Sequence, residues 1–288
     1  MALEDKGYDP FTNALVAKSM KNILILGGTG AMGKHLVQLL AERGDKVTVT
    51  TRARRESSAY IEYIQGNARE DRFIEPLLER QWDAIVDFMV YSTSFFRQRV
   101  PKLLEATGQY VFLSSARIYA DSTTPIQEDS PRLLDSSNNL EFLNTDEYSL
   151  AKARQEDLLK QSGKKNWTII RPYITYSEQR LQLGILEKEA WLYRALQGRT
   201  IVFSEDIIDK LTTLTYGLDV ASAIAALIGE PRILGEAYHI TQNDSVSWRQ
   251  VLDLYLKVLE KHHGRKPKVA LLDMKRFSRC KKAVYQIK

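Results

Sequence analysis

The sequence predicts an α/β fold built on a doubly wound parallel sheet, with a small discontinuous C-terminal lobe beside it. Between residues 21 and 170, short apolar runs alternate with segments in which apolar residues recur at helical spacing. This alternation is typical of parallel strands joined by right-handed helical crossovers. The regular order stops after residue 173, so we expect later segments to form the lobe.

Six apolar and β-branched runs are expected to form buried strands, because a parallel sheet of this kind is covered on both faces. They lie at residues 23–26, 47–50, 61–64, 84–88, 110–113 and 167–170. Amphipathic helices are expected at 31–43, 71–80, 94–106 and 146–161. Gly44 and Asp45 end the first of these helices, since glycine is favoured just beyond a helix C-terminus.

Two regions interrupt this order. Residues 120–145 are polar and rich in turn-forming residues, and a loop of that length in a compact domain is usually functional or mobile. The lobe is expected to contain helices near 185–197 and 247–261 and strands at 200–203 and 237–241. A helix that starts at Asp219 is expected to return to the main sheet.

The composition is that of an ordinary globular protein. Of the 288 residues, 44% are hydrophobic and 27% are charged, which excludes collagen-like and low-complexity classes. The single cysteine, Cys280, cannot form an internal disulfide, and the four histidines are scattered, so we expect no structural metal site. No apolar run reaches the ~18 residues of a membrane span, and we expect a reducing cytoplasm and no membrane partner.

The positive charge is concentrated at one end of the chain. The net charge is +5, yet residues 261–288 hold ten Lys and Arg residues against one Asp, which gives +9 and leaves −4 for residues 1–260. Because no basic stripe runs along the body, we interpret the tail as a solvated surface and do not expect nucleic acid as the partner.

The first 19 residues lack clean periodicity, and the run from Asp9 to Thr12 resembles a cloning scar. We hypothesise that residues 1–19 are a vector-derived leader and that the natural chain starts at Met20.

A glycine turn follows the first expected strand. The spacing Gly27-x-x-Gly30-x-x-Gly33 lies where the strand leads into a helix. Gly27 permits a tight turn, Gly30 lets the backbone approach a pyrophosphate, and Gly33 lets the helix pack close to the strand. The helix N-terminus that follows, at Met32 and Gly33, would offer free N–H groups to a phosphate. This arrangement predicts a dinucleotide site.

The end of the second strand favours NADP over NAD. An acidic residue there would hydrogen-bond the ribose 2′-hydroxyl of NAD. The sequence instead reads Thr50-Thr51-Arg52-Ala53-Arg54-Arg55, with no carboxylate before Glu56. Because guanidinium groups bind phosphate bidentately, we expect Arg52, supported by Arg54 or Arg55, to bind the 2′-phosphate, with NAD as the alternative cofactor.

A tyrosine and a lysine begin the long helix at 146–161. Their i,i+4 spacing places Tyr148 and Lys152 on one helix face. A nearby ammonium and a positively charged cofactor ring would lower the pKa of the phenol, which could then exchange a proton with a substrate hydroxyl. The fifth strand ends in Ser114-Ser115, and a serine at this position can orient the reacting oxygen.

These elements together resemble the extended short-chain dehydrogenase/reductases, the NAD(P)-dependent epimerase/dehydratase family, over most of residues 21–260. The family's motifs are matched by Gly27, Gly30 and Gly33, by Ser114 to Tyr119, by Tyr148 and Lys152, by Arg171-Pro172, and by Asp219-Val220-Ala221.

The resemblance implies a Rossmann NAD(P)-binding domain, here residues 20–173 plus about 212–228, and a substrate lobe with a basic tail, residues 174–211 and 229–288. It implies that Ser115 is the catalytic serine, that Lys152 also binds the cofactor, that the substrate is a small molecule of the nucleotide-sugar type, and that the protein is a homodimer.

The sequence departs from the family pattern at several positions. The family's Gly-Asp after the third strand is Gly66-Asn67 here, so the adenine side is expected to be bound by Asn67 and Ala68. Phe88 and Met89 stand where the family has small residues beside the cofactor, which narrows the nicotinamide end. The asparagine and glycine that usually follow Arg-Pro are absent from residues 173–177.

Two functions follow from these observations. The first is an oxidoreductase of the epimerase or reductase type, in which hydride transfer at a carbinol or carbonyl is assisted by Ser115, Tyr148 and Lys152. The alternative is a non-catalytic nucleotide- or RNA-binding protein, because residues 167–220 are similar to the chloroplast stem-loop RNA-binding proteins of plants. The intact serine, tyrosine and lysine favour the enzyme.

Overall fold

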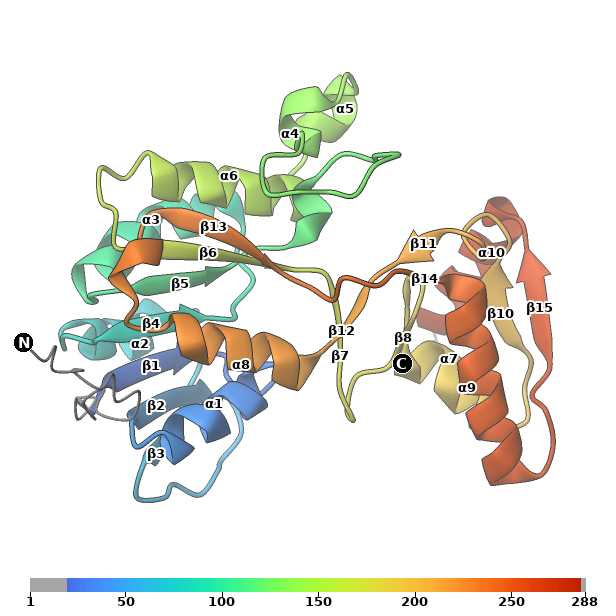
Figure 1. Cartoon of the computed structure of the whole chain (residues 1–288), viewed down its shortest axis with the longest axis horizontal. Coiled ribbons are helices and arrows are strands. Elements are labelled where there is room, and N and C mark those ends of the chain that lie inside the picture. Colours follow the sequence, from blue (N-terminus) through green and yellow to red (C-terminus); the bar gives the residue numbers. More distant parts are fainter. Residues whose placement is uncertain (1–19, 286–288) are drawn as a thin grey trace, which may run out of the picture.

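The central sheet positions everything else in the molecule. The computed structural model describes residues 20–285, with side chains to residue 279, so the proposed leader at residues 1–19 lies outside the described residues. Within that range seven parallel strands form the sheet in the order β13-β6-β5-β4-β1-β2-β3 (Figure 1). Their bounds are β1 Asn22–Leu26, β2 Lys46–Thr51, β3 Ile61–Gln65, β4 Ala84–Asp87, β5 Tyr110–Leu113, β6 Trp167–Pro172 and β13 Glu236–Ile240. The predicted doubly wound sheet is confirmed.

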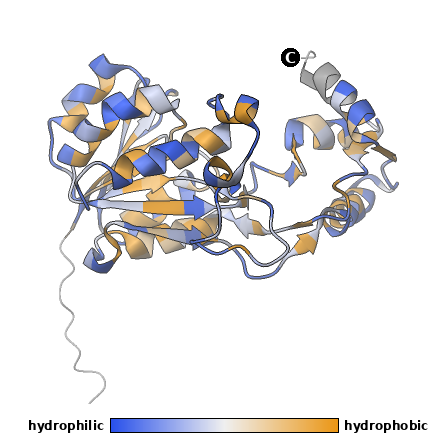
Figure 2. Ribbon diagram, turned by 90° about the horizontal axis from the view of Figure 1, so that it is seen from above, coloured by the Kyte–Doolittle hydropathy of each residue, from blue (hydrophilic) through white to orange (hydrophobic). Residues whose placement is uncertain are grey.

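Helices cover both faces of this sheet. One face is packed by α1 (Gly33–Glu42) and α8 (Gly217–Leu227), and the other by α2 (Asp71–Leu78), α3 (Thr93–Glu105) and α6 (Tyr148–Lys160). Strand β1 is apolar throughout because both of its faces are covered. Ile23 and Ile25 pack with α1, whereas Leu24 and Leu26 pack with α3. Figure 2 shows the apolar strands inside and mixed polar and apolar helices around them.

The seventh strand corrects the sequence analysis. The segment 229–288 was assigned to the lobe, but β13 pairs in parallel with β6 along its whole length, from Glu236 beside Thr168 to Ile240 beside Pro172. The strand expected at 237–241 is present, but it joins the main sheet. As an edge strand β13 needs no apolar run on two faces, and its polar residues Glu236 and His239 do not mark it as part of the central sheet. The sheet therefore takes this strand from the range assigned to the lobe.

The smaller lobe has a core of its own. Trp191, Phe203, Trp248, Leu256 and Phe277 pack together there, away from the sheet. Its elements are β8 Gln182–Leu183, β9 Leu186–Glu187, α7 Lys188–Leu196, β10 Ile201–Ser204, β11 Leu211–Thr212, β14 Val246–Ser247, α9 Trp248–His263, β15 Val269–Leu272 and α10 Met274–Tyr285. The parallel pair β7 (Ile174–Tyr176) and β12 (Leu214–Tyr216) leads from the sheet to this lobe (Figure 1).

The long polar segment contains little regular structure. Its elements are the 3₁₀ turn Ala116–Ile118 and the short helices α4 (Leu133–Ser136) and α5 (Leu140–Leu143), and a second 3₁₀ turn, Pro231–Ile233, precedes β13. Arg132 fastens the segment to α6, because its guanidinium donates to the Asp157 carboxylate at 2.7 Å. The segment thus lies over the carboxyl end of β5, beside α6.

Candidate cofactor and catalytic site

The glycine turn between β1 and α1 has the geometry that its spacing predicts. Gly27 adopts φ +73°, a left-handed conformation that L side chains rarely take. A Cβ at Gly33 would lie 2.6 Å from the carbonyl carbon of Gly28, so a side chain there is excluded. A Cβ at Gly30 would meet no atom within 4 Å. Gly27 and Gly33 are thus required by the fold, whereas Gly30 leaves the space that a ligand would use.

The first turn of α1 is suited to an anion. Met32 is its N-cap residue and supplies no side-chain hydrogen bond to the first N–H groups. These N–H groups and the helix dipole favour negative charge. The turn lies where β4 and β2 flank β1 on opposite sides and the strand order reverses, which is where doubly wound sheets bind their ligands. The residues present therefore fit a pyrophosphate.

The other expected cofactor residues also follow strand ends on this edge. Asn67, after β3, donates from its amide to Glu70 at 3.2 Å and accepts from the Arg69 N–H at 3.2 Å, so its orientation is fixed. Ala68 is buried. Phe88 follows β4 and packs partly buried against the core on the α1 face. Met89 places its sulfur 3.0 Å from the position of a Cβ at Gly27, directly over the glycine turn.

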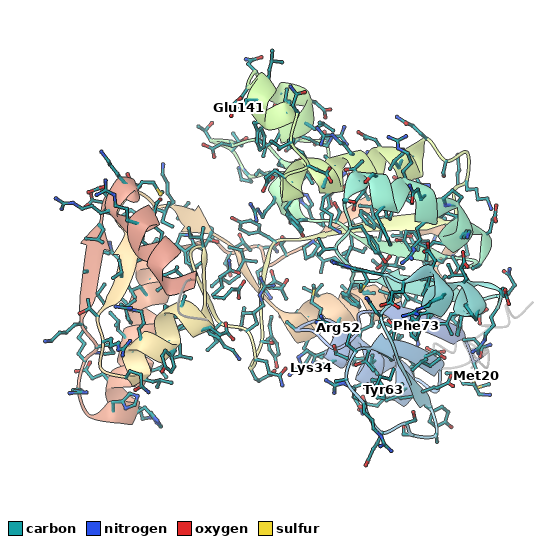
Figure 3. All side chains as sticks on the ribbon, turned by 180° about the vertical axis from the view of Figure 1, so that it is seen from behind. Met20, Lys34, Arg52, Tyr63, Phe73 and Glu141 are labelled. Carbon is teal, nitrogen blue, oxygen red and sulfur yellow. The ribbon has the colours of Figure 1, made fainter. Side chains whose placement is uncertain are left out.

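The arginines after β2 are exposed. Arg52 and Arg54 form no ion pair with any described residue, and Arg55 lies 5.8 Å from the centre of the Tyr63 ring. Figure 3 shows Arg52 and Lys34 on the side of the sheet domain that faces the smaller lobe. Arg52 is free to meet a ligand that extends beyond the end of β2.

Ser115 and Tyr148 come together at the carboxyl end of β5. Ser115 is the N-cap of the short turn after β5, where its Oγ accepts the N–H of Arg117 at 3.2 Å, and its hydroxyl lies close enough to the Tyr148 phenol to lower the pKa of that phenol. Tyr148 is the first residue of α6, whose start is fixed by the Glu147 carboxylate accepting the N–H of Ser149 at 2.7 Å. A strand end and a helix start thus bring the two hydroxyl groups together.

Burial dominates the titration of the phenol. It raises the pKa of Tyr148, while the Ser115 hydroxyl and the guanidinium groups of Arg117 and Arg180 lower it. The Arg117 guanidinium lies 5.4 Å from the centre of the Tyr148 ring. Lys152, which was expected to lower the pKa of the Tyr148 phenol, is not among the groups that do so. Arg117 of the serine turn and Arg180 of the lobe supply the positive charge instead.

Lys152 lies deeper than its spacing suggests. Its side chain is buried, and its Nζ donates to the Leu113 carbonyl oxygen at 2.6 Å and lies 4.4 Å from the centre of the Phe112 ring. Among the described residues, no hydrogen bond joins this ammonium to the Tyr148 phenol. Burial lowers the pKa of Lys152 to about 8, against the opposing effect of Asp87 and Glu156. Sharing a helix face therefore does not bring the two groups into contact.

A cavity of about 460 Å³ opens beside this pair. Tyr148 and Lys152 of α6 line it together with Arg69, Tyr91 and Phe95. The cavity reaches from the loop after β3 to the start of α6. Its wall therefore includes Tyr148 of the hydroxyl pair and Arg69, which follows Asn67 and Ala68 in the chain.

Sequence reasoning missed some of the charged residues at the site. Arg117 lies two positions after Ser115 and could have been noticed from that neighbourhood alone. Arg180 comes from the segment between β7 and β8 and could not, because no motif links it to the sheet. Glu178, two residues earlier, accepts a hydrogen bond from Lys34 of α1 at 2.7 Å and so ties the lobe to the glycine turn.

Among the described residues, neither a metal-binding cluster nor a membrane-spanning helix is found. Within residues 20–285, no cluster of three or more His, Cys, Asp or Glu side chains is arranged to hold a metal ion. In the same range, no helix is both long and apolar enough to cross a bilayer.

Comparison with known proteins shows the family of the chain. The model of the NAD dependent epimerase/dehydratase family matches residues 23–241, which span the sheet and most of the connections to the lobe. The chain belongs to this family. The match includes the glycine turn, the serine turn and the start of α6.

The curated relatives are distant and differ in function. The chain is 26% identical over 254 residues to the chloroplast stem-loop binding protein of 41 kDa b from Arabidopsis thaliana, covering 81% of this chain but only 61% of the plant protein. It is 25% identical over 259 residues to a UDP-N-acetyl-α-D-glucosaminuronate decarboxylase from Bacillus cytotoxicus, covering 80% of this chain and 78% of that enzyme.

A solved structure shares the fold. The Bordetella bronchiseptica enzyme WbmH, in complex with NAD⁺, superposes with a TM-score of 0.69 at 20% identity, over 88% of this chain and 86% of the other.

Proposed function

We propose that the protein is an NAD(P)-dependent oxidoreductase of the epimerase or reductase type, acting at a carbinol or carbonyl carbon of a nucleotide-sugar-like substrate. The proximity of Ser115 and Tyr148, at the same carboxyl edge of the sheet as the glycine turn, carries the proposal. Membership of the family supports it, as does the UDP-sugar substrate in the name of the Bacillus relative.

Each residue has a defined task. The Ser115 hydroxyl donates a hydrogen bond to the reacting oxygen of the substrate, and the Tyr148 phenol oxygen takes or returns the hydroxyl proton. Arg117 and Arg180 favour the phenolate form. A bound nicotinamide supplies the hydride acceptor or donor. The backbone from Gly27 to Gly33, with Met32 at the helix start, holds the dinucleotide, and Asn67, Ala68 and Phe88 line its adenosine and ribose side.

The choice between NAD and NADP depends on the end of β2. The solved relative holds NAD⁺ and the family description names NAD, so we propose that the chain accepts NAD. No carboxylate follows Thr51 to bind a ribose diol, whereas Arg52 and Arg54 are exposed there. These arginines would give additional affinity for the 2′-phosphate of NADP.

The lobe is proposed to bind the rest of the substrate. A cavity of about 470 Å³ lies between the connecting strands and α9, lined by Tyr176, Leu214 and Tyr255 with the polar side chains of Gln242 and Asp244. Aromatic walls with a few polar groups are typical of small-molecule sites. We therefore keep the division into a cofactor domain, residues 20–173 and about 212–228 with β13 added, and a substrate lobe.

The test is a comparison of Tyr148→Phe with Tyr193→Phe, a control at a tyrosine on the surface of α7. With UDP-glucose and UDP-glucuronic acid, reduced-nicotinamide absorbance follows net oxidation or reduction, and chromatographic separation of the sugar epimers follows epimerisation, in which the hydride is returned. Dinucleotide binding is measured by fluorescence. Tyr148→Phe is expected to lose at least ~10²-fold in turnover, as for a missing general base, with dinucleotide affinity nearly unchanged. Full turnover by Tyr148→Phe would show that the base has been misassigned.

A second function has one specific observation in its favour. The lobe exposes a group of cations, and the Arabidopsis relative is named for stem-loop binding. The exposed residues are Lys261, Arg265, Lys266, Lys268 and Lys275. Filter binding of a stem-loop RNA across a salt series tests this function, because phosphate contacts give a steep dependence of affinity on salt. Salt-insensitive or absent binding rejects it.

A further inference from the structure

A buried carboxylate that the proposed reaction does not use lies beneath the site. Asp87, the last residue of β4, is 0% exposed. Its carboxylate accepts hydrogen bonds from the Tyr110 hydroxyl at 2.8 Å, the Tyr91 hydroxyl at 3.3 Å and the Met89 N–H at 2.9 Å. Among the described residues, no cationic group lies within 4.0 Å of it. Burial raises the pKa of Asp87, and a nearby positive charge would favour the ionised form of this carboxyl.

The geometry of the sheet brings Lys152 to this carboxylate. In the register of β4 and β5, Asp87 pairs with Phe112, and residues paired in this way point to the same face of a parallel sheet. The Lys152 ammonium lies 4.4 Å from the centre of the Phe112 ring and donates to the next carbonyl, Leu113, at 2.6 Å. It therefore sits on the α3–α6 face, beside the strand end that carries Asp87.

The other charged groups nearby are already paired. Glu156, also on α6, holds the Arg171 guanidinium of β6 through hydrogen bonds of 2.9 and 2.6 Å. Arg99 of α3 donates to the carbonyl of Arg69 and to a carboxylate on α2. Asp87 and Lys152 are thus the buried charges left to balance each other, and each acts on the pKa of the other accordingly.

We propose that Asp87 is a positioning residue that keeps Lys152 as a buried ammonium at the wall of the cavity beside Tyr148. An ammonium has three N–H donors. One is used by Leu113, which leaves others for oxygen atoms of a ligand in the cavity that Lys152 lines. Because Tyr91 lines the same cavity and hydrogen-bonds Asp87, the carboxylate is anchored from the same side. The role toward a dinucleotide rests on the proposed function.

The direct test is the titration of Lys152 by NMR in protein carrying ¹³Cε-labelled lysine, with its signal assigned from its loss in Lys152→Arg. In Asp87→Asn the midpoint is expected to fall by at least about one pH unit, a tenfold change in the ratio of ammonium to amine. Tyr110→Phe is the matched control, since it removes a hydrogen bond to Asp87 and no charge. An unchanged midpoint in Asp87→Asn overturns the proposal.

Thermal unfolding gives a second, independent test. Asp87→Asn is expected to lower the Tm of the protein that contains Lys152, because it removes the charge that balances the ammonium. In the Lys152→Met background the same substitution is expected to raise the Tm, because it removes a buried charge that has lost its partner. A change of the same sign and size in both backgrounds overturns the proposal.

Dinucleotide binding then separates this role from the proposed function. Titrations with NADH, read by fluorescence from pH 6 to pH 10, are expected to show that affinity falls at a lower pH in Asp87→Asn than in the unsubstituted protein. Unchanged pH dependence overturns the role of Asp87 toward the cofactor. If the unsubstituted protein binds no dinucleotide, the proposed function fails, and the NMR and unfolding results still decide whether the two charges form a pair.

Discussion

Two substitutions in the glycine turn separate what the fold requires from what the ligand requires. A Cβ at Gly33 would lie 2.6 Å from backbone atoms of Gly28, so Gly33→Ala must displace α1 from the turn. Overpacking of this kind costs about 1–3 kcal/mol, and in a domain of this size each kcal/mol lowers the Tm by about 2–4 °C. Gly33→Ala is therefore expected to melt several degrees lower than the unsubstituted protein.

Gly30→Ala is expected to keep its stability and to lose affinity for the dinucleotide. No atom lies within 4 Å of the added Cβ, and Gly30 is not among the glycines with positive φ. A change from glycine to alanine at a compatible position gains about 0.4–1 kcal/mol from the unfolded chain, so its Tm is expected to be unchanged or slightly higher. The methyl group would stand where a pyrophosphate approaches, and we expect dinucleotide affinity to fall at least tenfold, or about 1.4 kcal/mol.

The assays are differential scanning calorimetry and fluorescence titration with NADH for both variants. Gly30→Ala is expected to remain stable and to bind the dinucleotide at least tenfold more weakly, whereas Gly33→Ala is expected to be destabilised. A Gly30→Ala protein with unchanged affinity would mean that the open space at Gly30 is not the phosphate seat.

Three further predictions concern the charges of the site. Arg52→Ala is expected to weaken NADP binding by at least tenfold, since a bidentate contact with phosphate is lost, with little change for NAD; equal losses for both cofactors would reject the 2′-phosphate role. Arg117→Ala removes a charge that lowers the pKa of Tyr148, so the acid limb of the pH–activity profile should move upward by less than about one unit because Arg117 is largely exposed; a downward shift would contradict this assignment. The pKa of Lys152 in the folded protein, about 8, lies below its value in the unfolded chain. Because the unfolded chain then binds more protons, the free energy of unfolding rises with pH between these two values. Chemical denaturation at pH 8 and pH 10 should show that Lys152→Met loses this rise, and a rise of equal size in the variant would refute the buried ammonium.

Features that depend on one short stretch of the sequence could be predicted. The glycine turn could be predicted because Gly27, Gly30 and Gly33 act within one strand–turn–helix unit, whose geometry depends on their own backbones. The pairing of Ser115 with Tyr148 was also accessible, since both follow directly from where a strand ends and a helix begins.

Features set by distant segments could not be predicted in the same way. The edge strand β13 is defined by its partner β6, whose paired residues lie 68 positions earlier, and its own residues are mixed in polarity. The i,i+4 spacing placed Lys152 on the face of Tyr148 but could not show that its long side chain turns inward to Leu113. Arg180 reaches the phenol's surroundings only because the lobe folds back toward the sheet edge.

The central claim is that the carboxyl edge of the sheet seats a nicotinamide dinucleotide with its reactive ring beside Ser115 and Tyr148. A crystal structure of the protein soaked with NADH tests it most directly. The account predicts the pyrophosphate at Gly30 and Met32, with the nicotinamide next to the two hydroxyl groups. A dinucleotide bound elsewhere, or a ring kept away from Tyr148 by Phe88 or Met89, would contradict it.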